Sequence, residues 1–420
     1  MNRRTFLGQT ATATLAAPSI LRSAESPNEK MRVAIMGCNG RGMAHIKNYL
    51  QVPNVEIYYV CDVDERAIGK GVKAVEGAQG NAPQGITDIR RALDDQSVDF
   101  VSIAAPNHWH APATILACSA GKHVYVEKPG SHNPWEARFM VEAAKHHKRV
   151  VQLGNQRRSW PWVINAIARL REGVIGELRF ARTWYNNARG SIGKGRLATV
   201  PTWLDYDLWQ GPAPERPFKD NLVHYNWHWH WHWGNGELGN NGIHALDVAR
   251  WGLGVDLPNR VTCNGNRYYY DDDQETPDVY FTTFDYGHVG ISWESHSCHP
   301  RGYEDVGFGI NFSGDEGSLV IAGNQYTIYD DRGDVVESVK GARIDQDHFQ
   351  NFLNCIRDGS LPNSDIADTQ HSSMLCHLGN IAYRTGRTLD IVPESGQIVG
   401  FNQDNGLWKR DYRQGWTPTL

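Results

Sequence analysis

The sequence lacks the features that mark several classes of protein. Its formal net charge is −5, so it has no excess of the positive charge that binds nucleic acid or an anionic membrane surface. Its seven cysteines are scattered without CxxC or zinc spacing, which predicts free thiols, or at most one bridge, rather than a disulfide framework. No repeat is present, and no apolar run beyond the N-terminal region approaches the length of a membrane span. What remains is a globular chain of 420 residues, long enough for two domains.

The N-terminus has the order of an export signal. Residues 2–7 (NRRTFL) form a twin-arginine pattern, residues 11–21 are mildly apolar, and small residues end at Ala24. This order predicts a twin-arginine signal peptide over residues 1–24, cleaved after Ala24, and therefore a periplasmic or exported protein. A disordered basic leader is the alternative. Because twin-arginine export carries folded proteins, a cofactor can be loaded before the protein crosses the membrane.

Residues 31–50 (MRVAIMGCNGRGMAHIKNYL) predict a strand, a glycine-rich turn and a helix. Residues 33–36 are continuously apolar, as in a parallel strand buried on both faces. A helix beginning near Met43 would present free N–H groups to an anion. Three glycines lie in the turn, where the backbone can bend sharply and approach a ligand: Gly37, Gly40 and Gly42. The pattern follows the dinucleotide fingerprint G-x-G-x-x-G, with Asn39 at the middle glycine.

Two patterns follow one another along the chain. Strands and helices alternate over residues 31–153, which predicts a doubly wound parallel sheet and an α/β class. Beyond residue 154 a long segment rich in Gly, Pro and Trp (residues 186–225) precedes alternating strands between residues 260 and 330. These strands predict a large, predominantly antiparallel sheet with helices on one side, an α+β domain over residues 154–420.

Polar residues follow the predicted strands of the first half, and ligands of open α/β sheets bind at the carboxyl ends of strands. The carboxylate of Asp62 can bind the adenosine ribose hydroxyls and would repel a 2′-phosphate, which favours NAD over NADP; a helix cap is its alternative role. The next strand leads into APNHWH, where Pro106, Asn107 and His110 should border the cofactor. Helix capping is the alternative for Asn107 and His110.

A further strand ends in VYVEKP, which puts Glu127 and Lys128 at another carboxyl end. Pro129 fixes the turn, and a cis bond before it would aim the lysine inward. A lysine beside a nicotinamide can hydrogen-bond a substrate hydroxyl and tune its proton acceptor. A solvated pair at a strand end is the alternative.

The glycine turn, APNHWH, VEKP and GNNGIHALDVARW (residues 239–251) together resemble the Gfo/Idh/MocA oxidoreductases, over essentially the whole chain after the signal. The resemblance implies an NAD- or NADP-binding Rossmann domain over residues 31–153, a sugar site in the C-terminal domain, and an open sheet that joins subunits into a dimer or tetramer. The predicted cofactor positions are Gly37, Asn39, Gly40, Arg41, Gly42, Asp62, Pro106, Asn107, His110, Glu127 and Lys128.

The resemblance also implies the catalytic residues. Lys128 matches the lysine of the family's EKP segment and His244 its catalytic histidine, while Asn240 stands where the family has an aspartate. A histidine titrates near neutrality, so His244 can accept a hydroxyl proton as hydride leaves the same carbon. Asp247 lies on the same helical face and can hold the orientation of the ring. A structural histidine near a helix start is the alternative.

Tryptophan and histidine alternate over residues 224–233 (HYNWHWHWHW). Alternate histidines on an extended edge can chelate a transition metal, but a half-buried strand with packed Trp gives the same alternation, and we assign no metal. Tryptophan faces suit the apolar faces of sugar rings. The residues assigned to substrate are Arg157, Trp203, Trp227 and His244, with loop packing as the alternative for the first two.

The sequence thus predicts an exported oxidoreductase that oxidises a ring hydroxyl of a sugar or glycoside. Free NAD is scarce outside the cytoplasm, so the cofactor is expected to be tightly bound and recycled. One alternative is a redox-assisted glycoside hydrolase or lyase, in which transient oxidation acidifies a neighbouring C–H before elimination. Another is a non-catalytic sugar-binding or sensing protein, motivated by Asn240.

Overall fold

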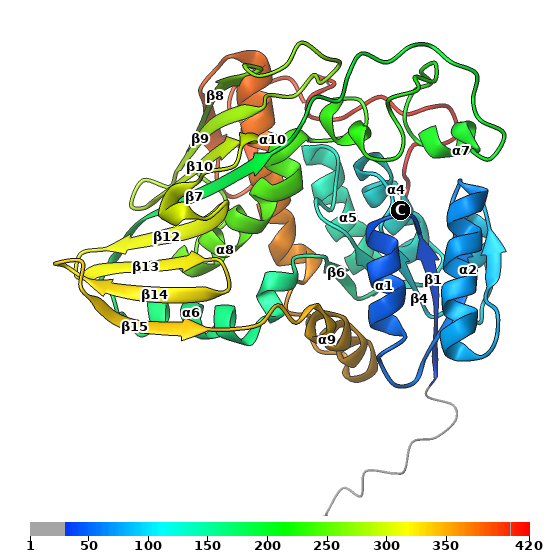
Figure 1. The fold of residues 1–420 in the computed structure, drawn as a ribbon, viewed down its shortest axis with the longest axis horizontal. Coiled ribbons are helices and arrows are strands. Elements are labelled where there is room, and N and C mark those ends of the chain that lie inside the picture. The colour runs from blue at the N-terminus through cyan, green and yellow to red at the C-terminus, as the bar shows by residue number, and fades with distance from the viewer. Residues whose placement is uncertain (1–29, 404) are drawn as a thin grey trace, which may run out of the picture. The chain divides into compact units, whose positions relative to one another are not determined.

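The first sheet of the computed structural model has six parallel strands in the order β3-β2-β1-β4-β5-β6 (Figure 1). The model describes residues 30–403 and 405–420, so the predicted signal peptide lies outside the described residues. The strands are β1 (Met31–Met36), β2 (Val55–Cys61), β3 (Gln84–Ile86), β4 (Phe100–Ile103), β5 (His123–Val126) and β6 (Val151–Leu153). The order reverses beside β1, and the crevice at such a reversal is where open α/β sheets bind ligands.

Helices cover both faces of this sheet: α1 (Arg41–Tyr49), α2 (Glu65–Gln79), α3 (Arg90–Asp94), α4 (Asn107–Ser119) and α5 (Pro134–His146). Their ends follow local rules. The Asp64 side chain caps α2 and Gly80 ends it in a left-handed conformation, while Asn133 caps α5 ahead of a proline. Helix α1 begins after Gly40, and no side chain caps its N–H groups.

The second sheet has eleven strands, ordered β15-β14-β13-β12-β7-β10-β9-β8-β16-β17, with β11 paired to β7. Only β7 and β10 pair in parallel; the other neighbours are antiparallel. The strands are β7 (Leu178–Ala188), β8 (Arg260–Asn266), β9 (Val279–Asp285), β10 (Gly290–His296), β11 (Cys298–His299), β12 (Phe308–Gly314), β13 (Gly317–Ala322), β14 (Gln325–Asp330), β15 (Val335–Lys340), β16 (Leu389–Val392) and β17 (Gln397–Ile398). This arrangement confirms the predicted fold class.

One face of the second sheet is packed and the other is open. Helices α6 (Pro161–Arg171), α8 (Ile243–Leu253) and α10 (Ile366–Thr385) bury the inward side chains in one apolar core. Burial alternates along β10, as expected for a sheet with one covered face. On the open face Phe281 is 48% exposed. Among the residues that the structure describes, no helix combines the length and apolarity needed to cross a membrane.

The chain returns to the first sheet near its end. Helix α9 (Asp345–Asp358) packs on α1 and places Phe349, Phe352 and Leu353 in the core beneath β1. Helix α10 packs on α5. The segment between β7 and α8 passes over the carboxyl ends of the first sheet's strands and carries the short helix α7 (Tyr206–Gln210) (Figure 1).

Three local features differ from the sequence prediction. One π-turn (Leu238–Gly242) directly precedes α8, and the sequence did not predict it. The Trp-His run forms a 3₁₀ turn (Asn226–Trp229) instead of an extended edge. Strand β15 was not predicted, because it is an exposed strand held by backbone pairing, with no buried alternation for a sequence to show.

Candidate active site

A cavity of about 500 Å³ opens at the carboxyl ends of β1, β2 and β4, and its opposite wall comes from the segment between β7 and α8. Most of the predicted cofactor residues line it: Gly37, Asn39, Gly40, Arg41, Asp62, Pro106, Asn107, His110, Glu127 and Lys128. So do three residues predicted for catalysis or substrate binding: Trp227, Asn240 and His244. Four predicted residues are not on this wall: Gly42, Arg157, Trp203 and Asp247.

The glycine turn is built for close approach. Gly37 has φ +86°, and a Cβ there would lie 2.7 Å from the backbone of Ala104 on β4's end. A Cβ on Gly42 would lie 1.6 Å from the Gly37 carbonyl oxygen, so Gly42 packs behind the turn rather than on the wall. Gly40 faces open space, and the uncapped N–H groups of α1 begin there. This cradle suits the pyrophosphate of a dinucleotide.

Asp62 closes the same end of the cavity. Its carboxylate accepts hydrogen bonds from the backbone N–H of Cys38 (2.6 Å) and of Asp64 (3.0 Å), which fixes it at the end of β2. Burial raises the pKa of Asp62. A fixed carboxylate on the wall suits two ribose hydroxyls, and the residues therefore fit a dinucleotide at both its pyrophosphate and its ribose.

Trp203 lies near this end and does not reach the cavity, contrary to its predicted place at the substrate. The Arg66 guanidinium lies 3.3 Å from its ring centroid, and the His224 ring stacks on it. Arg66 and His224 in turn contact Asp64 at 2.8 Å each. Trp203 thus packs the segment between β7 and α8 against the start of α2.

Glu127 organises the wall beside the turn. Its Oε1 accepts from Arg41 Nε (2.8 Å) and Gln156 Nε2 (3.0 Å), and His45 Nε2 lies 3.1 Å away. Burial opposes its ionisation, but the Arg41 charge and the His45 contact outweigh burial and hold the pKa of Glu127 well below its usual value. Glu127 is therefore a permanent anion that positions Arg41. Gln156 was not singled out from the sequence.

Lys128 and Asn240 join the two halves of the cavity. The Lys128–Pro129 peptide is cis, and Lys128 Nζ donates to the Asn240 carbonyl oxygen (2.8 Å) and to its Oδ1 (3.3 Å). Burial lowers the pKa of Lys128, although Glu127 partly opposes that effect. A lysine has three donors, so one N–H remains for a ligand.

Glu237 supplies a carboxylate near the position where Asn240 replaces an aspartate. Its side chain is fully buried; Oε1 accepts from Asn240 Nδ2 (3.4 Å) and from Asn241, and Oε2 from Arg189 Nε (3.1 Å). The π-turn brings the two side chains together. Glu237 was not predicted as a site residue; the signal in the sequence is an acidic residue between Gly236 and Gly239, directly ahead of a buried helix.

His244 lies at the start of α8, on the wall opposite the glycine turn. Burial, followed by the charges of Lys128 and Arg157, holds its pKa well below the usual value, so the ring is neutral at neutral pH. Among the described residues none forms a hydrogen bond with this ring, which leaves its acceptor nitrogen available.

Asp247 does not orient His244, contrary to the prediction. Its two oxygens accept from Arg158 Nε (2.9 Å) and Nη2 (2.8 Å), and Ser372 Oγ donates to it at 2.7 Å. Asp247 and His244 do lie on the same face of α8, as predicted. The Asp247 carboxylate, however, points toward buried donors on the neighbouring segments. Asp247 therefore links α8 to Arg158 and Ser372 and does not contact the His244 imidazole.

The Trp-His run separates its histidines. His228 stacks on Trp227 with ring centroids 3.6 Å apart, and both line the cavity. His230 Nδ1 lies 3.6 Å from Glu275 instead, and His232 Nε2 lies 2.7 Å from the Pro214 carbonyl oxygen. Because the run is a turn, alternate residues do not share a face.

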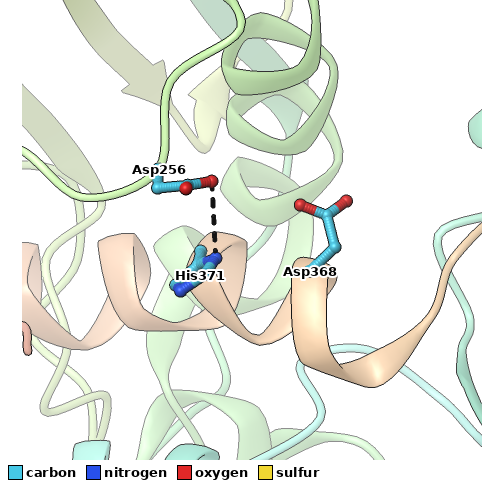
Figure 2. Close-up of side chains that lie close together, drawn as sticks. All are labelled: Asp256, Asp368 and His371. Carbon is cyan, nitrogen blue, oxygen red and sulfur yellow. Dashed lines mark ion pairs between the residues drawn. The ribbon is translucent and has the colours of Figure 1, made fainter. Parts of the chain in front are cut away.

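A second polar cluster lies away from the cavity and consists of Asp256, Asp368 and His371 (Figure 2). Arg250 donates to Asp256 Oδ1 (2.9 Å) and to Asp368 Oδ1 (2.6 Å), and Arg158 also binds Asp368 (2.6 Å), so both carboxylates already have a guanidinium partner. His371 Nδ1 lies 3.6 Å from Asp256. The cluster is an ion-pair network that links α8 and α10.

The chain is similar to known proteins in sequence and in fold. Residues 31–155 match the oxidoreductase family with an NAD-binding Rossmann fold, and residues 181–418 match the C-terminal alpha/beta domain of an oxidoreductase family. A glycosyl hydrolase family 109 protein from Saccharopolyspora erythraea is 31% identical over 40% of this chain and 37% of its own length. Another from Parabacteroides distasonis is 28% identical over 57% of this chain and 53% of its own.

The chain thus spans between about a third and a half of the length of these curated relatives. A solved structure of levoglucosan dehydrogenase, in complex with NADH and levoglucosan, has the same fold, with a TM-score of 0.67 at 19% identity. The likeness covers 86% of this chain and 99% of that one. The two matched domains account for most of the sequence, and the chain belongs to the Gfo/Idh/MocA family of oxidoreductases.

Proposed function

We propose that this protein is an NAD-dependent enzyme that removes hydride and a proton from a ring hydroxyl of a sugar or glycoside. The observation that carries the proposal is the convergence of Lys128, Asn240 and His244 on one cavity wall, opposite a glycine turn suited to a dinucleotide. A dinucleotide complex with a sugar-derived substrate in a protein of the same fold supports it.

Different residues of the wall would bind different parts of the cofactor. The N–H groups at the start of α1 would bind the pyrophosphate, and Asp62 would accept hydrogen bonds from the ribose hydroxyls. A 2′-phosphate would face the Asp62 carboxylate, which favours NAD over NADP. When bound, the nicotinamide supplies a hydride acceptor.

The residues at the substrate end would accept the proton of the reacting hydroxyl group. His244 is neutral, so a ring nitrogen can accept the proton of the hydroxyl group. The free N–H of Lys128 would donate to the same hydroxyl oxygen and stabilise the charge that develops there. Glu237 holds Asn240, and Asn240 holds Lys128, so the lysine is directed before substrate arrives.

Hydrolysis by transient oxidation is the second candidate, favoured by curated relatives that are described as glycosyl hydrolases. Here oxidation to a ketone would acidify the adjacent C–H, loss of that proton would expel the aglycone, water would add to the resulting alkene, and hydride would return. The net result is bond cleavage with no net change in NAD.

Purification tests the proposal and separates the two candidates. We expect the purified protein to carry dinucleotide or to bind NAD with a saturable isotherm. Accumulation of NADH with a keto-sugar indicates net oxidation, whereas release of aglycone without NADH indicates hydrolysis. A protein that carries no dinucleotide and binds neither NAD nor NADP would refute both.

We further propose that residues 1–24 direct export, that the cofactor stays tightly bound afterwards, and that the open face of the second sheet joins subunits into a dimer or tetramer. Mass spectrometry of periplasmic protein should show a chain that begins at Glu25, with dinucleotide released only on denaturation. Light scattering measures the subunit number.

A further inference from the structure

Arg157 lies on the wall of a second cavity, of about 550 Å³, which shares His244 and Gln156 with the first. Its guanidinium carbon lies 4.1 Å from the Phe308 ring centroid and 4.8 Å from that of Trp160. Among the residues that the structure describes, none accepts a hydrogen bond from this side chain or forms an ion pair with it. Arg157 thus lies in the same cavity as the proposed base, His244, where it could contact a bound substrate.

Three other arginines of this region are paired with carboxylates. Arg158, the next residue, binds Asp247 at 2.8 Å and Asp368 at 2.6 Å. Arg41 binds Glu127 at 2.8 Å, and Arg189 binds Glu237 at 3.1 Å. Arg157 differs from these three because its guanidinium has no acceptor among the described residues, so its N–H donors are free to bind a ligand.

Arg343 reinforces the positive charge. It lines the second cavity with Arg157, and both also line an adjoining cavity of about 300 Å³ beside Tyr185 and Asn186. Arg343 Nε donates to Asn324 Oδ1 at 2.9 Å, and its two terminal nitrogens make no hydrogen bond within the described part of the chain.

The acidic charge facing these two arginines is small, because Asp345 only partly offsets the charge of Arg157. Among the described residues, none on the wall of the adjoining cavity is acidic, and the carboxylate of the second cavity, Asp345, already accepts from Arg41 and Trp160. Burial, followed by the charge of Arg343, lowers the pKa of Arg157 to about 9. The whole chain carries a net charge of −5, so this is a local concentration of positive charge and not a generally basic surface.

We infer that the substrate is an acidic sugar or glycoside, with a carboxylate or sulfate group bound by Arg157 and Arg343 while its reacting hydroxyl lies at His244. The planar guanidinium fork matches the paired oxygens of either anion. This inference rests on the proposed function, because that function places the reacting carbon at His244.

Binding measurements test the inference without turnover. The probes are the methyl glycosides of glucose and galactose, each with its uronate and its 6-sulfate, titrated calorimetrically into NAD-saturated protein. We expect at least one acidic member to bind tenfold or more tighter than its neutral parent, with the preference falling as salt rises. The uronate and sulfate series show which anion is recognised.

Arg157→Ala and Arg343→Ala should each remove most of that preference and leave the affinity for the neutral parent within threefold. Arg157→Lys should keep part of it. Arg171→Ala, at the exposed end of α6, is the matched control and should change nothing. Circular dichroism confirms that each variant is folded.

Two outcomes overturn the inference: no acidic member binds more tightly than its neutral parent, or the arginine variants weaken neutral and acidic members equally. The proposed function fails separately. A clear acid preference in a protein that transfers no hydride to NAD and cleaves no glycoside would keep the anion site and remove the assigned chemistry.

Discussion

The two ends of the main cavity differ in the groups that form them. The glycine-turn end consists mainly of backbone, namely two glycines and the uncapped start of α1, together with the side chain of Asp62. The opposite end consists of side chains from both halves of the chain, and the buried Glu237, paired with Arg189, holds Asn240 there. The first end depends on the local shape of the chain, whereas the second depends on charges brought together by the whole fold. Mutations should therefore separate cofactor binding from chemistry.

The largest effect is expected at the side-chain end. His244→Ala should lower kcat by about 10²- to 10⁴-fold, because it removes the group that accepts the proton, while bound dinucleotide stays near one per chain. Steady-state kinetics and dinucleotide content measure the two quantities. His146→Ala, on the exposed surface of α5, is the control. Loss of the dinucleotide together with activity would contradict the division between the ends.

Glu237→Gln should reveal how far the side-chain end depends on its buried charge. The amide keeps the shape but leaves Arg189 without its anion, so we expect a loss of about 3 kcal/mol in the free energy of unfolding. We also expect a drop in kcat that exceeds any change in NAD affinity. Chemical denaturation and kinetics provide the test, with Glu142→Gln on α5 as control. Unchanged stability and kcat would show that Glu237 is not needed to position Lys128.

Gly42→Ala tests the backbone end. The added Cβ meets the Gly37 carbonyl oxygen, so the turn must shift, at a cost of about 1–3 kcal/mol, and NAD binding should weaken. Gly69→Ala on α2 meets nothing within 4 Å and should instead stabilise the protein by about 0.5–1 kcal/mol. Equal effects of the two substitutions would remove the special role of the turn.

Asp62→Asn should alter cofactor choice. Removing the negative charge should weaken the binding of NAD by about tenfold, or about 1.4 kcal/mol. The difference in affinity between NAD and NADP should therefore become smaller. Calorimetric titration with both dinucleotides measures the ratio, and Asp94→Asn on α3 should leave it unchanged. An unaltered ratio would mean that Asp62 does not face the ribose.

The smallest effect is expected from pH. Because the folded protein holds the pKa of His244 well below 6.5, the base is already unprotonated at pH 6.5. kcat/KM should then change less than about twofold between pH 6.5 and 7.5, and its acid limb should lie below pH 6.5. A limb centred above pH 6.5 would contradict the role of a neutral His244.

The same contrast explains what the sequence could predict. Gly37, Gly40 and Asp62 follow from a strand, turn and helix that are adjacent in the chain, and the fold class follows from repeated patterns of the same kind. Lys128 and His244 were assigned through the family resemblance, and the structure places both on the cavity wall. Their roles remain predictions.

Other residues could not be placed from local patterns. Asp247 bonds Arg158, which is 89 positions away, and only the packed fold brings them together. Trp203 lies under Arg66 because the long segment crosses α2, and Glu237 reaches Asn240 because one turn of the helix is wide. Each depends on a distant partner or on a single irregular turn, which leave no periodic signal.

The return of α9 to the first sheet has a consequence for synthesis on the ribosome. Phe349, Phe352 and Leu353 are completely buried against the strands that carry the glycine turn. A nascent chain that ends before residue 345 would leave that side of the nucleotide-binding half uncovered and open to chaperones or proteases. The core of the nucleotide-binding half, although encoded first, is therefore completed only after α9 has been synthesised, and stable loading of a cofactor is expected to follow that step.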